Sequence, residues 1–373
     1  MTPRPHRSLL AAAAASIVLL IALAAPAAAA GPKVSVIARG LDNPRGLAVD
    51  AWGRVYVATA GKGGPAGYGT TGKIVVIGNG HKHTFKGGLP SIISPEGDVS
   101  GPVNVAVRDG RVYGVVGGGP QDVNKRFGTL LRVSPDRSRI LADIAGYQLT
   151  DPDPTDLDVP ANPTESNPYG VAALKHGRVL VTDAAGNDLL LVKPNGVVQT
   201  VARFPNEIIS TNSLPASFGV PPGLMFPAEA VPTSVAVGPD GYWYVGELKG
   251  FPFAAGTSRI WRIAPWARDV TCDPTATSGP CTLFMDGFTS VVGIAWHGKT
   301  LYVVEIVKSG VANFFGGIDS VGALWKIRNG TKTELAPGRL TLPGGVAVGR
   351  TGTIYVTNQS VSVGGGEVLK IRP

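Results

Sequence analysis

Four polar side chains stand at equivalent positions of a repeated pattern and could bind a cation. Each ends a short apolar strand with an oxygen-bearing group: Asp183, Glu247, Glu305 and Asn358. Carboxylate and amide oxygens are the ligands that Ca²⁺ and Mg²⁺ prefer. A ring of repeats would place these groups around its axis, where they could hold a divalent cation such as Ca²⁺ in a channel. The alternative is that they bond turn backbone or channel water.

Further polar residues precede or begin the first strand of three repeats. They are Asn43, Asn104 and Asn167, with Arg45 and Tyr169 two residues beyond the first and last of them. Their side chains would approach the same channel mouth. We therefore expect them, together with the four residues above, to contact a ligand there.

The positions of the histidines argue against histidine-based acid–base catalysis at this channel mouth. His176 and His297 fall in turns between first and second strands, and His81 and His83 lie in another short turn. The sequence has no G-x-S-x-G or H-E-x-x-H motif. Catalytic residues are therefore not assigned, and enzymatic activity is left open.

The elements that position these residues form six copies of one unit. Each copy has an apolar strand, a tight polar turn, a second strand and, after a loop, a third strand. The copies begin at Asn43, Gly101, Asn167, Val231, Ser290 and Leu342. The third strands are expected at Lys73–Ile77, Thr129–Val133, Leu189–Val192, Arg259–Ile263, Ala323–Ile327 and Glu367–Ile371. Repeated hairpins at this period predict an all-β, six-bladed propeller of four-stranded antiparallel blades.

The two ends of the mature chain complement each other. Lys33–Arg39 resembles a fourth strand with no third strand of its own, and Glu367–Ile371 is a third strand with no fourth strand after it. We expect the N-terminal strand to complete the last blade, which removes the free edges of the ring.

Long loops gather on one face of the predicted ring, and loops on a rigid scaffold commonly carry function. They are Gly61–Thr71, Gly117–Phe127, Lys249–Ser258 and Lys308–Gly322. The same face carries an insertion with four acidic residues, Asp151–Asp158. We interpret this insertion as a solvated segment rather than a calcium-binding loop. Phe251, Phe253, Phe314 and Phe315 in these loops either pack together or grip an aromatic ligand.

The N-terminus predicts export. Arg4 and Arg7 precede an apolar run and a small-residue site at Ala28–Ala30, so residues 1–30 read as a Sec-type signal peptide cleaved near Ala30-Gly31. Residues 31–373 then form one secreted or periplasmic domain without a membrane span. In an oxidising compartment the only cysteines, Cys272 and Cys281, are expected to pair. The 34 basic and 26 acidic residues are scattered, which argues against nucleic-acid binding.

Several segments together resemble the ScyD/ScyE family over nearly the whole mature chain. They include NPYGVAAL with VLVTDAAGNDLLLVKPNG, VPTSVAVGPDGYWYVGELKGFPF, and LTLPGGVAVG with IYVTN. The family is named for exported proteins encoded with the biosynthesis of scytonemin, an indolic-phenolic pigment. The resemblance implies an exported, NHL-like propeller, but it brings no catalytic residue set. More loosely, the acids that end the second strands resemble those of gluconolactonase-like propellers, in which a channel metal activates water, although an acidic residue near the N-terminus is not evident here.

Two functions follow as expectations. The first is a monomeric binding or accessory module that holds a small aromatic ligand, a glycan or another exported protein. The alternative is a carboxylate-metal enzyme, either a lactonase-like hydrolase or an accessory enzyme of phenolic or indolic metabolite assembly.

Overall fold

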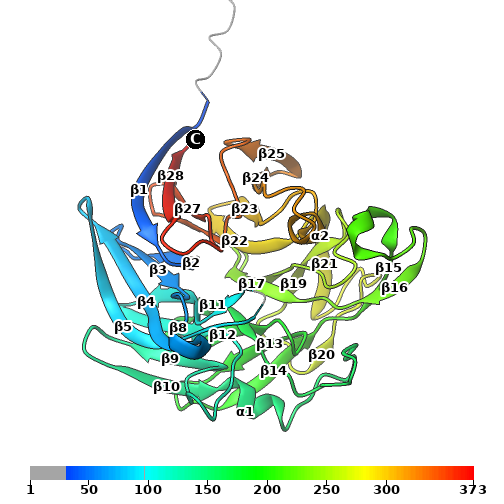
Figure 1. Cartoon of the computed structure of the whole chain (residues 1–373), viewed down its shortest axis with the longest axis horizontal. Helices are drawn as coiled ribbons and strands as arrows, with labels where there is room; N and C mark the ends of the chain where they lie inside the picture. The colour runs from blue at the N-terminus through cyan, green and yellow to red at the C-terminus, as the bar shows by residue number, and fades with distance from the viewer. Residues whose placement is uncertain (1–30, 96) are drawn as a thin grey trace, which may run out of the picture. The chain divides into compact units, whose positions relative to one another are not determined.

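Six small antiparallel sheets stand in a ring and form a six-bladed β-propeller (Figure 1). The computed structural model describes residues 31–95 and 97–373. The predicted signal peptide, residues 1–30, lies outside the described residues. Among the described residues no helix is both long and apolar enough to cross a membrane. The fold class predicted from the repeats is confirmed.

Each blade runs from an inner first strand to an outer fourth strand. Blade one comprises β2 (Pro44–Val49), β3 (Val55–Thr59), β4 (Tyr68–Gly78) and β5 (His81–Ile93), with the short β6 (Val99–Ser100) at its edge. Blade two comprises β7 (Pro102–Arg108), β8 (Arg111–Val116), β9 (Thr129–Val133) and β10 (Ser138–Asp143). Blade three comprises β11 (Pro168–Ala173), β12 (Val179–Asp183), β13 (Asp188–Val192) and β14 (Val198–Arg203).

The remaining blades follow the same order along the chain. Blade four comprises β17 (Pro232–Val237), β18 (Trp243–Glu247), β19 (Ser258–Ile263) and β21 (Cys281–Phe288). Blade five comprises β22 (Val291–His297), β23 (Thr300–Glu305), β24 (Ala323–Arg328) and β25 (Thr331–Leu335). Blade six comprises β26 (Gly345–Val348), β27 (Ile354–Asn358), β28 (Gly366–Arg372) and β1 (Lys33–Leu41).

Among the described residues, two short α-helices and an extra hairpin lie in the connections. The helices are α1 (Ile144–Gln148), between blades two and three, and α2 (Val311–Phe315), in blade five. The hairpin is β15 (Glu207–Ser210) with β16 (Met225–Ala228), and it stands outside the six blades.

The N-terminal strand closes the ring, as predicted. β1 pairs antiparallel with β28, and Val34 lies opposite Ile371 and Val36 opposite Leu369. Figure 1 shows the blue β1 beside the red β28. The last blade is therefore built from both ends of the described chain, and β1 forms its outermost strand.

The third strands match the predicted ranges closely, with one exception in blade one. There β4 starts at Tyr68, because the hairpin with β5 continues through irregular pairs such as Tyr68 with Ile92. The predicted loop Gly61–Thr71 is therefore shorter than expected. Glycine and threonine in that stretch permit strand pairing through local bulges.

The hydrophobic core lies between neighbouring blades. Strand residues alternate between the two faces, so successive side chains of β12 contact different blades. Val179 and Val181 pack against blade two, whereas Leu180 packs against blade four. The six blades are thus held by face-to-face apolar contacts.

A disulfide staples an excursion of blade four, as predicted from the cysteine spacing. Cys272 and Cys281 are bonded, and both are buried. The excursion also contains β20 (Val270–Thr271), which pairs in parallel with β14 of blade three. The staple therefore helps join two neighbouring blades.

Candidate functional site

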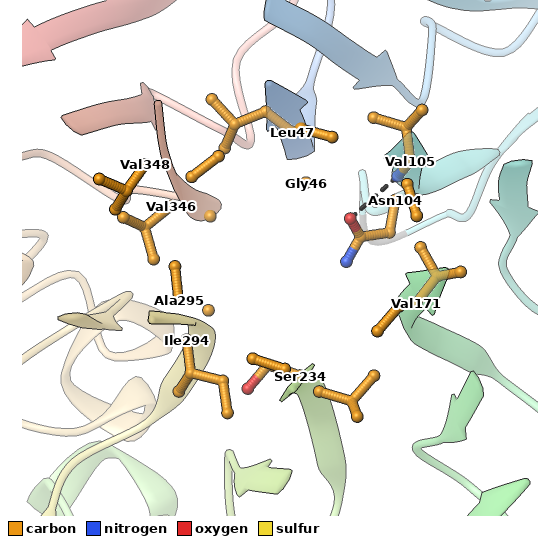
Figure 2. A pocket seen from close by; sticks show the side chains of 18 of the residues that line it. Gly46, Leu47, Asn104, Val105, Val171, Ser234, Ile294, Ala295, Val346 and Val348 are labelled. Carbon is orange, nitrogen blue, oxygen red and sulfur yellow. Dashed lines mark hydrogen bonds between the residues drawn. The ribbon is translucent and has the colours of Figure 1, made fainter. Parts of the chain in front are cut away.

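The inner strands of all six blades surround a central channel with a cavity of about 260 Å³ (Figure 2). Its walls are mainly valine, alanine and glycine. Two polar side chains face it, Asn104 and Ser234. The Oδ1 of Asn104 accepts a hydrogen bond from the Val105 backbone N–H at 2.9 Å. The Ser234 hydroxyl is buried and has no partner among the described residues.

The four residues predicted as cation ligands end β12, β18, β23 and β27, one strand outward from the channel wall. They belong to four different blades, and all four are buried. Those residues line neither the channel nor the mouth cavity described below. The structure therefore does not bring Asp183, Glu247, Glu305 and Asn358 together.

Asp183 and Asn358 hold the backbone that leads into the first strand. The carboxylate of Asp183 accepts hydrogen bonds from Ser166 Oγ at 2.5 Å and from the Asn167 N–H at 2.7 Å. Asn358 accepts one from the Thr341 N–H at 2.8 Å. These are the strand-end contacts that the alternative interpretation described.

Glu305 follows the same pattern. Its carboxylate accepts a hydrogen bond from the Thr289 N–H at 2.8 Å, and Lys332 Nζ lies 3.7 Å away. Burial raises the pKa of Glu305, although Trp325 and the Thr289 N–H oppose this shift.

Glu247 belongs to a buried ion-pair network. Its Oε2 lies 2.8 Å from Lys249 Nζ, and its other oxygen accepts a hydrogen bond from the Trp261 indole. Glu207 of the extra hairpin contacts Lys249 at 3.4 Å and Arg259 at 2.7 Å. Burial raises the pKa of Glu247, and Lys249 counteracts part of that effect.

No group of three or more His, Cys, Asp or Glu side chains within residues 31–95 and 97–373 is arranged to hold a metal ion. The channel cation inferred from the sequence stays a prediction.

A separate cavity of about 380 Å³ opens where blades one, two and three meet on the long-loop face. It is lined by three of the predicted ligand residues: Arg45, Asn167 and Tyr169. Arg45 comes from β2, Tyr169 from β11 and Asn167 from the residue before β11. The remaining walls are Ile92, Ser94, Asp98, Val99, Ser100, Val103, Gly118 and Gly119.

The polar groups of this cavity, hereafter the mouth cavity, are held by backbone contacts. Arg45 Nη2 donates to the Val99 carbonyl at 3.2 Å, while its Nε is buried without a hydrogen-bond partner in the described part of the chain. Asn167 Oδ1 accepts from the Gly118 N–H at 3.0 Å, and Ser100 Oγ donates to the Gly118 carbonyl at 2.6 Å. The guanidinium is thus fixed in place with donor capacity to spare.

The other two asparagines predicted as ligands, Asn43 and Asn104, do not line the mouth cavity. Asn104 faces the channel, as described above. Asn43 is buried, and its Nδ2 donates to the Gly61 carbonyl at 2.8 Å, which pins the loop after β3.

The loop phenylalanines pack on one another. Phe251 contacts Phe226 of β16 and Phe253, with ring centroids 5.6 and 6.1 Å apart. Phe253 contacts Phe315 at 5.9 Å, and Phe314 lies 5.8 Å from Phe315. Self-packing of these loops is therefore observed, although Phe315 remains 56% exposed.

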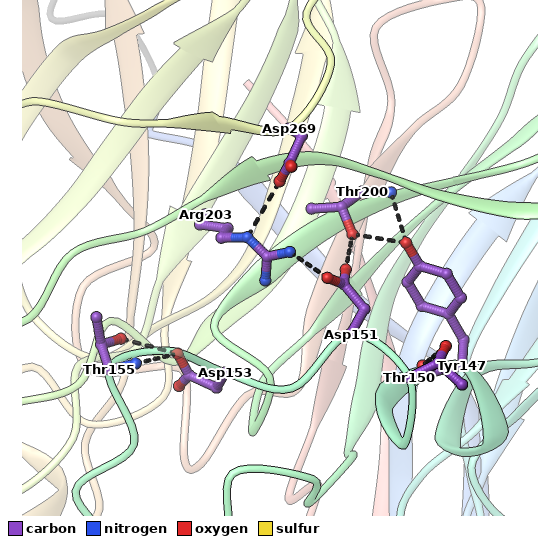
Figure 3. Close-up of polar contacts among 8 residues, drawn as sticks. All are labelled: Tyr147, Thr150, Asp151, Asp153, Thr155, Thr200, Arg203 and Asp269. Atoms are coloured by element: carbon purple, nitrogen blue, oxygen red, sulfur yellow. Dashed lines mark hydrogen bonds and ion pairs between the residues drawn. The ribbon is translucent and has the colours of Figure 1, made fainter.

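The acidic insertion is more ordered than the sequence suggested (Figure 3). Asp151 accepts hydrogen bonds from Arg203 at 2.5 Å and from the Thr200 hydroxyl. Asp153 is buried and accepts from the Thr155 N–H at 2.8 Å and from Asn187 at 2.9 Å. The expectation of a solvated segment is wrong for Asp151 and Asp153, to which blade three supplies partners, whereas Asp158 is exposed.

Sequence reasoning missed Asp98 in the mouth cavity and Asp188 beside Asp183. Asp98 lies in the β5–β6 connection, for which no repeat pattern exists. Asp188 could have been found, because two acids that flank a four-residue turn become cross-strand neighbours. The structure pairs Asp183 with Asp188.

Comparison with known proteins supports the fold. No protein-family model matches the chain, and no curated protein matches it. An oxidoreductase (glucose dehydrogenase) from Thermus thermophilus is 16% identical with a TM-score of 0.53, covering 92% of this chain and 100% of that one. The soluble aldose sugar dehydrogenase of Escherichia coli, in its apo form, is 15% identical with a TM-score of 0.51, covering 92% and 99%. A streptogramin B lyase is 12% identical with a TM-score of 0.50, covering 91% and 97%. At such identities the likeness shows a shared propeller fold and no shared activity.

Proposed function

We propose that this chain is an exported binding propeller of ScyD/ScyE type that holds a small aromatic ligand in the mouth cavity. The observation that carries the proposal is the convergence of Arg45, Asn167 and Tyr169, from two different blades, on one cavity. Concave sites with apolar walls and a few placed polar groups are typical of small-molecule binding.

The lining suggests the chemistry of the ligand. Arg45 lines the cavity and uses only Nη2 for a hydrogen bond among the described residues, so its guanidinium suits a carboxylate or another acceptor group. Ile92, Val99 and Val103 offer apolar contact, and the Tyr169 ring can pack against an aromatic face. Asp98 can accept a hydrogen bond from a ligand hydroxyl. A phenolic or indolic acid combines these features.

The buried disulfide and the absence of a spanning helix among the described residues are consistent with export. The carboxylate-metal enzyme has less support, because each of its four candidate ligands bonds within or beside its own blade.

The test is titration calorimetry with 4-hydroxyphenylacetate and indole-3-acetate as probes. We expect saturable binding by the wild type and at least a tenfold weaker affinity for Arg45→Met, because the charge-assisted hydrogen bond is lost. Arg350→Met is the matched control, since exposed Arg350 lies in the turn between β26 and β27 on the opposite face. Absence of binding by the wild type, or equal loss in both variants, would refute the proposal.

A further inference from the structure

We propose that a divalent cation of the calcium type binds between blades two and three, with the carboxylate of Asp188 and the side-chain carbonyl of Gln148 as protein ligands. This site is distinct from the channel and from the mouth cavity, and it does not depend on the proposed ligand-binding function.

The strand pattern places Asp188 on the face of blade three that packs against blade two. Leu190 and Val192, at alternate positions of β13, belong to the apolar cluster between these blades. Asp188 shares their face because side chains alternate along a strand. Asp183 and Arg203, its cross-strand partners on either side, point the same way.

Helix α1 covers this part of blade three. Its first residue, Ile144, lies in the same apolar cluster. Its last residue, Gln148, is fully buried, and its amide sits where a side chain on Gly186 would begin. Gly186 itself donates its N–H to Asp183 at 3.2 Å. Gln148 therefore lies against the turn that joins Asp183 to Asp188.

The decisive observation is that these buried polar atoms have no partners. Both carboxylate oxygens of Asp188 and both amide atoms of Gln148 are buried without a hydrogen bond among the described residues, and both side chains are 0% exposed. By contrast Asp183, the cross-strand neighbour of Asp188, accepts four hydrogen bonds. Unsatisfied buried carboxylates are costly, so a guest that binds oxygen would be favoured.

The surrounding charge favours a cation over a neutral guest. Burial raises the pKa of Asp188, Asp183 raises it further, Arg203 opposes them, and Asp151 and Asp153 add smaller upward contributions, so the ionised form needs a cation beside it. Arg203 already contacts Asp151 at 2.5 Å and Asp269 at 3.2 Å (Figure 3). Its Nη1 has no partner among the described residues, but one guanidinium does not balance these carboxylates. Water alone would leave that excess negative charge buried.

Two side-chain ligands are few for Ca²⁺, which takes six to eight oxygens. Water and backbone carbonyls would complete the shell.

The experiment is calcium analysis of the purified protein, combined with thermal melting in CaCl2 and in EDTA. For the wild type we expect one bound equivalent after desalting and a higher melting temperature with calcium. Asp188→Asn and Gln148→Met should lose both effects. Asp269→Asn is the matched control, because Asp269 is exposed and contacts the same arginine, and it should keep both.

Melting in EDTA guards against a variant that merely misfolds. Asp188→Asn removes a buried, uncompensated charge while keeping the side-chain shape, so in EDTA it should melt no lower than the wild type. In CaCl2 the wild type should then melt at a higher temperature than Asp188→Asn. A wild type without bound metal and without a calcium-dependent shift would overturn the proposal, and so would a shift that Asp188→Asn retains.

Discussion

Lys249 and Glu247 form an ion pair in which both side chains are completely buried, with Nζ 2.8 Å from Oε2. Lys249 adopts a positive φ of 78° two residues after the end of β18, and its N–H donates to the Ala230 carbonyl. The same ammonium reaches Glu207, so the pair ties the extra hairpin to blade four.

Replacing one member of this pair should destabilise the fold strongly. Lys249→Met leaves the Glu247 carboxylate buried without its cation, and we expect a loss of about 3–5 kcal/mol in the free energy of unfolding. The double variant Glu247→Gln/Lys249→Met should lose less. Urea unfolding measures both, and equal losses would contradict an energetic role for the pair.

Removing β28 should abolish cooperative folding. A chain that stops at residue 365 lacks the partner of both β27 and β1, so blade six would keep only two strands of its four. Circular dichroism during heating measures the transition. Removing Gly31 and Pro32, which precede β1, is the control and should leave melting unchanged. A truncated protein with the wild-type transition would show that ring closure is dispensable.

The disulfide should contribute a moderate stabilisation. Its cysteines are nine residues apart, and closing a loop of this size is worth about 2–3 kcal/mol in the chain-entropy account. Cys272→Ser/Cys281→Ser should therefore unfold at lower urea concentration than the wild type. If reductant lowers the stability of the double variant as much as that of the wild type, the loss caused by reductant does not come from this disulfide.

Tyr244 should make stability fall at alkaline pH. Burial and a hydrogen bond to Asp240 at 3.0 Å raise its pKa to about 12. The unfolded phenol ionises near pH 10, so the stabilisation is complete below about pH 10 and is lost as the pH rises towards the folded value.

Tyr244→Phe removes this pH-dependent loss, although it also removes the hydrogen bond to Asp240. The stability difference between wild type and variant should therefore shrink between about pH 10 and pH 12. Urea unfolding at several pH values measures it. A constant difference across this range would contradict the raised pKa.

Much of the fold could be predicted from the sequence, because the same kinds of turn residues recur in successive hairpins. The third strands of blades two and three end at the last apolar residue before a polar turn, at Val133 and Val192. The pairing of β1 with β28 followed from counting strands at the two ends.

The site was readable only in part. Arg45 and Tyr169 were predicted from their repeat positions beside the axis, and both line the mouth cavity. The buried ion pair of Glu247 with Lys249 was not predicted, because Lys249 adopts an unusual backbone conformation that residue types do not reveal. Asp98 was missed because its hairpin has no counterpart in the other blades.

Ring closure also fixes an order of events in time. β1 is synthesised at the start of the domain, but its partner β28 follows more than 300 residues later. At ordinary translation rates of about 5–20 residues per second, β1 waits roughly 15 to 60 seconds before β28 exists. Blades one to five can assemble within that interval, whereas blade six cannot. The nascent chain therefore carries β1 without its partner until β28 has emerged, which makes this interval the one in which chaperones would most need to shield that strand.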